Sequence, residues 1–169
     1  HHEGEHLYVC GPARLVNAAL EQANNPSERG APLYYKDDVS PLMEKDLLEV
    51  IDGNYKIAPG ITTFMTDGPS IGHQVVLIES GSERIAYAGD LMPTSYHLAP
   101  GCISSLDYSP NKTLIAKREV LSMALDKGWL LVFGNAQENY AGYVEQRGGR
   151  YGLRAIDISY FFTAESIRF

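Results

Sequence analysis

Residues 59–98 read PGITTFMTDGPSIGHQVVLIESGSERIAYAGDLMPTSYHL, and this stretch decides the fold. Two apolar runs of strand length, 73–80 and 83–88, are separated by a short turn that contains Gly81, so they predict a β-hairpin. Polar loops precede and follow the hairpin, and loops held by rigid strands commonly carry functional side chains. Asp90 follows the second run directly, where a carboxylate can point into a cleft at the end of a sheet.

This stretch resembles the central part of a metallo-β-lactamase-fold hydrolase of the lactonase and phosphotriesterase-like kind, which typically reads pGi…tpGHTpGHqsvli…iyaGDl.pt..Hl here. Downstream, SLDYSPNKTLIAKREVLSMALDKGWLLVFGNAQ (105–137) is similar to the family's aYD..P..tl..K..ll..a...gw.l.feHDp. The matches span residues 50–157, about two-thirds of the chain. The resemblance implies a single α/β domain over residues 1–169, a metallo-β-lactamase-like αββα sandwich that is incomplete at its N-terminal sheet.

The resemblance also implies roles for individual residues. Asp90 matches the carboxylate that bridges two metal ions, and is the predicted catalytic and metal-binding residue. The first-loop histidine of the family falls on Pro69, which has no donor atom, and the last metal-binding histidine falls on Asn135. His73 matches the second histidine of the loop motif, which is usually structural. One of the three ligand positions in this region is therefore retained.

The other ligands of the family come from a His-x-His-x-Asp-His cluster. The opening HHEGEH can be aligned with that cluster through His1, Glu3, Glu5 and His6, so His1 and His6 are candidate metal ligands. The alternative is the remnant of a tag or a processed terminus. His97 matches the family's final Hl, which predicts that it packs beneath the site and orients its loop, and Tyr96 before it is a candidate pocket or structural residue.

Composition restricts the classes of function. The formal net charge is −7 and the sequence pI is near 5.2, which argues against a general nucleic-acid or anionic-membrane surface. No apolar run has the length of a membrane span. Cys10 and Cys102 are far apart in the sequence and are typical of buried free thiols. A cytoplasmic protein is the expectation.

Other segments carry weaker signals. Apolar periodicity predicts helices over 12–23 and 113–127, with Leu114, Leu121 and Leu125 on the core face of the second and Lys117 and Arg118 reaching water beside it. Residues 27–46 read as a long connection, because they contain Gly30, Pro32 and Pro41. Strands are expected on either side of a turn within 47–57, over 129–133, and in a closing hairpin formed by 143–145 and 151–158.

Two functions from different classes follow. The first is a degenerate member of the fold with impaired or absent metal-dependent hydrolysis, which acts as a binding or assembly module. The alternative is a hydrolase of lactones, esters or phosphoesters, in which zinc or another divalent metal activates a water molecule. A second copy of the chain, or a further N-terminal segment, is expected to cover the sheet face that the incomplete sandwich exposes.

Overall fold

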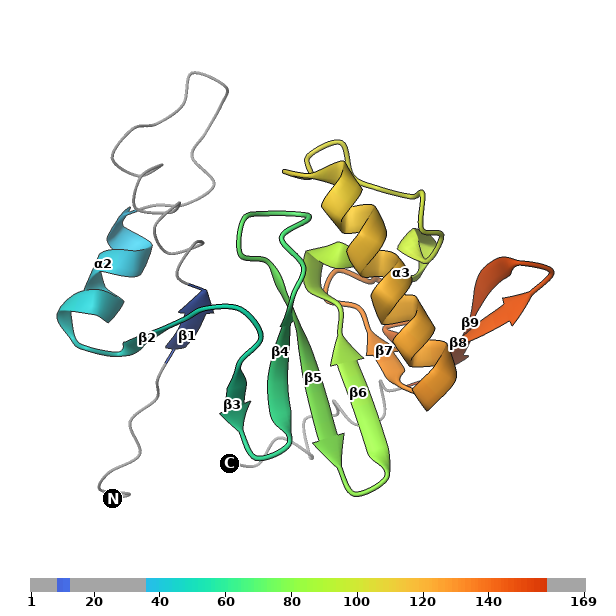
Figure 1. Ribbon diagram of the computed structural model, residues 1–169, viewed down its shortest axis with the longest axis horizontal. Coiled ribbons are helices and arrows are strands. Elements are labelled where there is room, and N and C mark those ends of the chain that lie inside the picture. Colours follow the sequence, from blue (N-terminus) through green and yellow to red (C-terminus); the bar gives the residue numbers. More distant parts are fainter. Residues whose placement is uncertain (1–8, 13–35, 158–169) are drawn as a thin grey trace.

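The computed structural model describes residues 9–12 and 36–157, and Figure 1 shows their arrangement. The elements in chain order are β1 (Val9–Pro12), α2 (Lys36–Glu44), β2 (Leu48–Ile51), β3 (Lys56–Ala58), β4 (Ile61–Met65), β5 (Gln74–Ser80), β6 (Glu83–Tyr87), the short 3-10 helices η1 (Gly89–Leu91) and η2 (Ser95–His97), α3 (Pro110–Lys127), β7 (Leu130–Val132), β8 (Ala141–Arg147) and β9 (Arg150–Ile156). Within these residues, no helix is both long and apolar enough to cross a membrane.

A seven-stranded mixed sheet carries most of the structure, with the strands β3 to β9 side by side in sequence order. Neighbouring strands are antiparallel except for β6 and β7, which are parallel. Helix α3 makes the crossover between these two parallel strands. Because β6 and β7 run in the same direction, the loops that follow them begin at the same edge of the sheet.

Tight turns explain two of the hairpins. Gly81 begins the turn between β5 and β6 with a φ of 60°, and Gly148 and Gly149 connect β8 to β9 with φ values of 56° and 76°. Two-residue hairpin turns with positive φ favour glycine because it has no Cβ. Both predicted hairpins are confirmed, although in the second the first strand has seven residues where three were predicted, and the second strand runs from Arg150 to Ile156.

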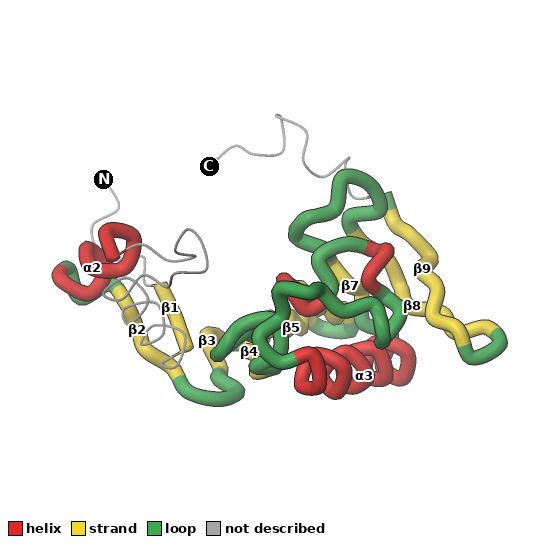
Figure 2. The backbone as a smooth tube through the Cα atoms, turned by 90° about the horizontal axis from the view of Figure 1, so that it is seen from above, coloured by secondary structure: helices red, strands yellow, loops and turns green. Residues whose placement is uncertain are grey.

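Helix α3 packs on one face of the seven-stranded sheet and encloses the hydrophobic core (Figure 2). Its buried apolar residues Val120 and Leu121 join Val75, Ala86 and Leu131 from the strands in this core. The helix begins after Ser109 and ends at Gly128, whose left-handed conformation (φ 66°) makes it the expected glycine C-cap. The predicted helix is confirmed and starts at Pro110, since proline is well suited to the first helical turn.

The opposite face of the sheet carries two cross-strand rows of side chains. Alternation along each strand places residues of the same parity on one face. The strand register aligns the first row as Ile61, Ile78, Ile85, Leu130, Tyr143 and Arg154, and the second as Thr63, Val76, Tyr87, Val132, Ala141 and Ile156. Most of these side chains are apolar and only partly buried, and Tyr87 is 42% exposed. We call these two rows the open face.

The structure corrects the sequence analysis at three elements. Pro12 ends strand β1 instead of starting a helix, and the remainder of that predicted helix lies outside the described residues. Residues 36–44 form helix α2, with Pro41 inside it, where a long connection was predicted. The strands within 47–57 exist but do not pair with each other, because β2 pairs with β1 in parallel and β3 pairs with β4.

Two side chains also differ from expectation. Lys117 was predicted to reach water, but it is fully buried and its Nζ donates hydrogen bonds to the carbonyl oxygens of Ala99 (2.9 Å) and Cys102 (2.7 Å). The loop before α3 folds over the helix at this point, and this contact could not be inferred from periodicity. Cys102 itself is an exposed free thiol, so the prediction of a buried thiol is wrong for this residue.

Candidate functional site

The loops that follow β6 and β7 bring Asp90 and Asn135 together at the end of the sheet where these two strands finish. Asp90 lies in η1, directly after β6, and its carboxylate is exposed to solvent. Asn135 follows β7, and its side-chain Nδ2 donates a long hydrogen bond to Asp90 Oδ1 at 3.4 Å. The backbone N–H of Asn135 donates to the carbonyl oxygen of Pro93 at 3.0 Å, which joins the two loops. Two residues that are 45 positions apart in the sequence thus share one site.

The ring of His73 contacts the backbone of Asp90. Its Nε2 accepts a hydrogen bond from the backbone N–H of Asp90 at 3.1 Å, so Nε2 carries no proton. The proton of the neutral ring is therefore on Nδ1, which donates to Thr66 Oγ1 at 2.6 Å, and the hydroxyl of Thr66 donates in turn to the carbonyl oxygen of His73. Burial lowers the pKa of His73 from its ordinary value of 6.5, against the opposing effect of the charges on Asp90 and Asp107.

Gly89 allows this close contact between the histidine and the loop. Its φ is 53°, and a Cβ at this position would lie 3.0 Å from His73 Nε2. A side chain here would therefore be strained by the backbone and would press on the ring. Both ring nitrogens of His73 are thus engaged within the two loops, and its structural role stays a prediction.

Pro69 belongs to a loop that rests on the start of α3. The carbonyl oxygens of Gly68 and Pro69 accept hydrogen bonds from the backbone N–H groups of Ser109 (2.9 Å) and Tyr108 (3.0 Å). Asp67 accepts from the backbone N–H of Gly72 at 2.8 Å and forms an ion pair with Lys112 at 3.2 Å. The loop is thus fixed by its backbone and by Asp67, and the proline ring contributes no donor atom.

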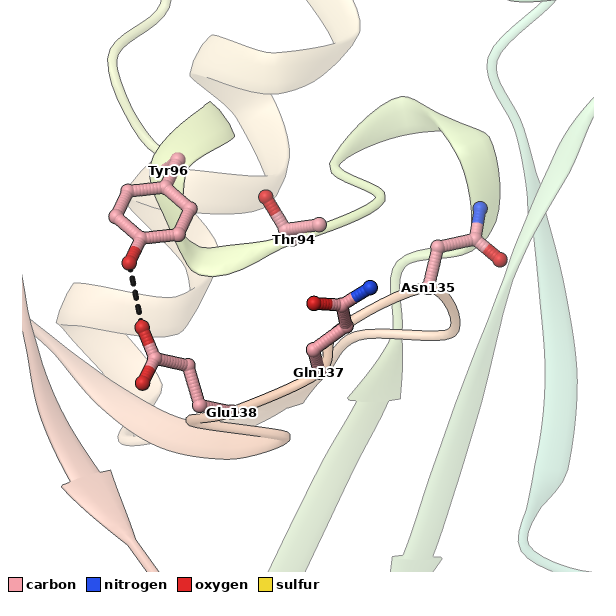
Figure 3. Close-up of a pocket in the computed structure, with 5 residues that line it drawn as sticks. All are labelled: Thr94, Tyr96, Asn135, Gln137 and Glu138. Carbon is pink, nitrogen blue, oxygen red and sulfur yellow. Dashed lines mark hydrogen bonds between the residues drawn. The ribbon is translucent and has the colours of Figure 1, made fainter.

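Asn135, the hydrogen-bond partner of Asp90, also lines a pocket of about 630 Å³ (Figure 3). The pocket is lined by Thr94 and Tyr96 from the loop after β6, and by Asn135, Gln137 and Glu138 from the loop after β7. We call it the amide pocket. The hydroxyl of Tyr96 donates to Glu138 Oε1 at 2.5 Å and connects the two loops. This hydrogen bond and the charge of Glu138 raise the pKa of Tyr96.

His97 lies at the base of the loop that carries Thr94. Its Nδ1 is 2.8 Å from Thr94 Oγ1, and its backbone N–H donates to the carbonyl oxygen of Thr94 at 3.0 Å. His97 thus contacts Thr94 at the pocket wall, and the role predicted for it in orienting its loop stays a prediction. The candidate ligands His1 and His6 lie outside the described residues.

The described residues do not fit a dinuclear metal centre. A zinc site with catalytic function usually has three protein ligands, supplied by imidazole, thiolate or carboxylate groups. Asp90 is such a group, but Pro69 has no donor, Asn135 offers an amide, and both ring nitrogens of His73 are engaged. Over the described residues, no three His, Cys, Asp or Glu side chains gather in a group that could hold a metal ion.

The fold is metallo-β-lactamase-like, as comparison with solved structures shows. A hydrolase of the β-lactamase superfamily, AbOPH, has a TM-score of 0.65 and 18% identity over 72% of this chain. A probable metal-dependent hydrolase from Staphylococcus aureus has a TM-score of 0.62 and 19% identity over 82% of this chain. AidC, a dizinc quorum-quenching lactonase in complex with a homoserine product, has a TM-score of 0.60 and 17% identity over 84%.

Sequence identity at this level establishes the fold alone. The chain spans about half the length of these structures, with 43%, 50% and 51% of their chains covered. No protein-family model matches the sequence.

Several residues of the site were not predicted from the sequence. Thr94, Gln137 and Glu138 line the pocket, and Thr66 holds the ring of His73. Their polar side chains in loops that follow strands were a weak signal, since such residues are common in any surface loop. The parallel pairing of β6 with β7 is what makes the two loops neighbours, and the sequence alone did not predict it.

Proposed function

We propose that this protein is a degenerate member of the metallo-β-lactamase fold that binds a small molecule in the amide pocket, with metal-dependent hydrolysis impaired or absent. The observation that carries the proposal is the Asp90–Asn135 contact. The one retained ligand of the family pattern, Asp90, accepts a hydrogen bond from the amide that stands in place of a metal-binding histidine.

The pocket chemistry supports binding. A concave site lined by a few convergent polar groups is the usual form of a small-molecule site. Amides and hydroxyls both donate and accept hydrogen bonds, so Thr94, Asn135 and Gln137 can orient a polar ligand without metal coordination. The hydrogen bond from Tyr96 to Glu138 joins the two loops that line the pocket.

Hydrolysis assays test the proposal. The purified protein, supplied with zinc, manganese or iron(II), is expected to leave acyl-homoserine lactone and aryl phosphoester substrates unchanged above background. The double variant Pro69→His with Asn135→His restores two imidazoles to the loop positions of the family pattern, and serves as the comparison. Metal-dependent turnover by the unmodified protein at ordinary enzyme rates, about 1 s⁻¹ or more, would contradict the proposal.

The alternative function is a metal-dependent hydrolase whose missing ligands come from residues 1–6. It is favoured by the exposed carboxylate of Asp90 at the end of β6, and by the fold shared with a dizinc lactonase. Under this alternative, zinc or another divalent metal would be held by Asp90 with His1 and His6. Substitution of His6 by Ala would then abolish metal-dependent hydrolysis, whereas the proposed function predicts no hydrolysis to abolish.

The cellular setting and assembly of the protein are also proposals. We place the protein in the cytoplasm because its sequence contains only two cysteines, one of them a free thiol. We expect a second copy or further chain to cover the open face. The partly exposed apolar rows on this face support that expectation.

A further inference from the structure

We infer that the amide pocket selects a ligand that carries a primary ammonium group and rejects carboxylate ligands. The inference rests on the proposed function and names the chemical class of the ligand for the same pocket. It draws on the charge of the lining, the exposed ring of Tyr96, and the carboxylate next to the pocket.

The charged groups at the pocket are of one sign. Glu138 belongs to the lining, and Asp90 adjoins it through the side chain of Asn135. The described lining contains neither Lys nor Arg. A ligand carboxylate would therefore meet negative charge without a compensating cation from the described lining, whereas an ammonium group would be attracted. The net charge of −7 on the whole chain acts in the same direction.

Tyr96 supplies a second feature that favours a cation. Its side chain is 73% exposed, and its hydroxyl is directed to Glu138. An aromatic face beside a carboxylate suits an ammonium group, which can contact the ring and donate to the carboxylate together. The donation from Tyr96 occupies only part of the acceptor capacity of Glu138, since a carboxylate has several lone-pair positions.

A side-chain amide of the lining adds an acceptor for the ammonium group of the ligand. An ammonium group has three N–H donors and no acceptor, so it requires several acceptor oxygens. The side-chain carbonyl oxygen of Gln137 points to the side of the pocket that carries Glu138, whereas the amide of Asn135 is directed away from these two residues, and its Nδ2 donates to Asp90 (Figure 3). A neutral alcohol of the same length can form hydrogen bonds with the polar lining but is not attracted by the charge of Glu138. It is therefore the proper comparison.

The test compares three probes of equal length, butylammonium, 1-butanol and butyrate, by NMR titration of the uniformly labelled full chain at low ionic strength. We expect butylammonium to shift the amide signals of residues 94–97 and 135–138, and to bind about five-fold more tightly than 1-butanol. Butyrate is expected to leave these signals unchanged. Addition of salt should reduce the advantage of the amine, since exposed charges are screened.

Two matched variants test whether the preference for the amine comes from Glu138. Glu138→Gln keeps the size and hydrogen bonding of the side chain and is expected to remove the advantage of butylammonium over 1-butanol. Glu119→Gln, at an exposed carboxylate on α3 that does not line the pocket, should leave both affinities unchanged. Equal affinity for the amine and the alcohol, an unchanged advantage in Glu138→Gln, or no shift with any probe would overturn the inference.

The two proposals fail separately. If 1-butanol or butyrate occupies the pocket and the amine has no advantage, the ligand class is wrong but a binding function stands. If the unmodified protein turns over lactone substrates with metal, the proposed function fails whatever the amine titration shows.

Discussion

His73 shows how one buried ring fixes the position of a loop. It is neutral in the folded state because Nε2 must accept the backbone N–H of Asp90. Protonation would replace that acceptor with a donor, and burial makes the charged form still less favourable, so the pKa is lowered. The unfolded chain then binds a proton more readily than the folded chain, and stability falls as the pH falls through the unfolded value of 6.5 toward the folded pKa.

The substitution His73→Gln should therefore have a pH-dependent cost. We expect it to lower the free energy of unfolding by about 1–2 kcal/mol near pH 8, because it breaks the hydrogen bonds to Asp90 and Thr66. The cost should shrink toward pH 5, because the wild-type protein there loses the stability that neutral His73 contributes. Urea unfolding across this range measures the cost, and His97→Gln, which leaves these two hydrogen bonds intact, is the baseline. A cost that grows as the pH falls would contradict the assignment of the neutral ring.

Lys117 is a second buried residue whose hydrogen bonds fix the position of a loop. Its buried Nζ holds the carbonyls of Ala99 and Cys102, and burial lowers its pKa. Lys117→Met keeps the approximate length of the side chain but leaves both carbonyls without this donor, at an expected cost of about 1–3 kcal/mol. Arg118→Met, at an exposed neighbour, should cost less than about 0.5 kcal/mol.

Urea unfolding and limited proteolysis within residues 99–107 measure these two effects. Lys117→Met should speed cleavage in this loop, whereas Arg118→Met should not. Equal cleavage rates in the two variants would mean that Lys117 does not hold the loop.

At the scale of elements, the loop 66–73 is held by its contact with the start of α3. Gly68 is buried there, and a Cβ would lie 2.4 Å from Thr113 Oγ1 and 2.7 Å from the backbone of Thr113. Backbone atoms of a helix cannot move aside as the end of a flexible side chain can. This contact couples the loop, and through His73 the site, to the helix that closes the core.

The substitution Gly68→Ala should force the loop away from the helix. We expect a loss of about 1–3 kcal/mol in the free energy of unfolding, since overpacking at a rigid contact costs that much. Gly101→Ala is the matched control, because a Cβ there meets nothing within 4 Å. Thermal unfolding of the two variants gives the comparison, and equal stability of both would contradict the close packing of Gly68.

Short-range sequence patterns predicted the elements whose formation depends on residues close together in the chain. The β5–β6 hairpin, the β8–β9 hairpin and α3 were evident because glycine turns, apolar periodicity and a glycine C-cap are short-range signals. Helix α2 was missed because Pro41 reads as a breaker. The pairing of β2 with β1 was missed because parallel partners that are distant in sequence leave no local signal.

The site was predictable in part for the same reason. Asp90, Asn135, Pro69 and His73 were found through a family pattern, and the structure brings Asp90, Asn135 and His73 into contact. Tyr96 was a candidate pocket or structural residue, but its contact with Glu138, which is 42 residues away, was not apparent from either loop alone.

At the scale of the whole molecule, α3 covers one face of the seven-stranded sheet (Figure 2). The strand register places the two apolar rows on the open face. Ile85 lies in the middle of the first row, between Ile78 and Leu130. If a second copy or further chain covers this face, an aspartate there would be buried without a partner. If the face is bare, the aspartate would be hydrated at little cost.

We expect Ile85→Asp to destabilise the protein by more than about 2 kcal/mol, or to convert an oligomer to a monomer. Light scattering after size exclusion gives the mass, and urea unfolding gives the stability. Ile115→Asp, at an exposed position on α3, is the control and should change neither. An Ile85→Asp variant with unchanged mass and stability would show that nothing covers the open face.

The measurement that tests the central claim most directly is the metal content of the purified, tag-free protein, by elemental analysis with intact mass on the same sample. If Pro69 and Asn135 occupy the histidine positions of the family pattern, as the sequence resemblance implies, the site lacks two of its ligands, so we predict far less than one zinc, iron or manganese per chain. About two metal ions per chain, lost together with hydrolytic activity on chelation, would contradict the account and establish the hydrolase.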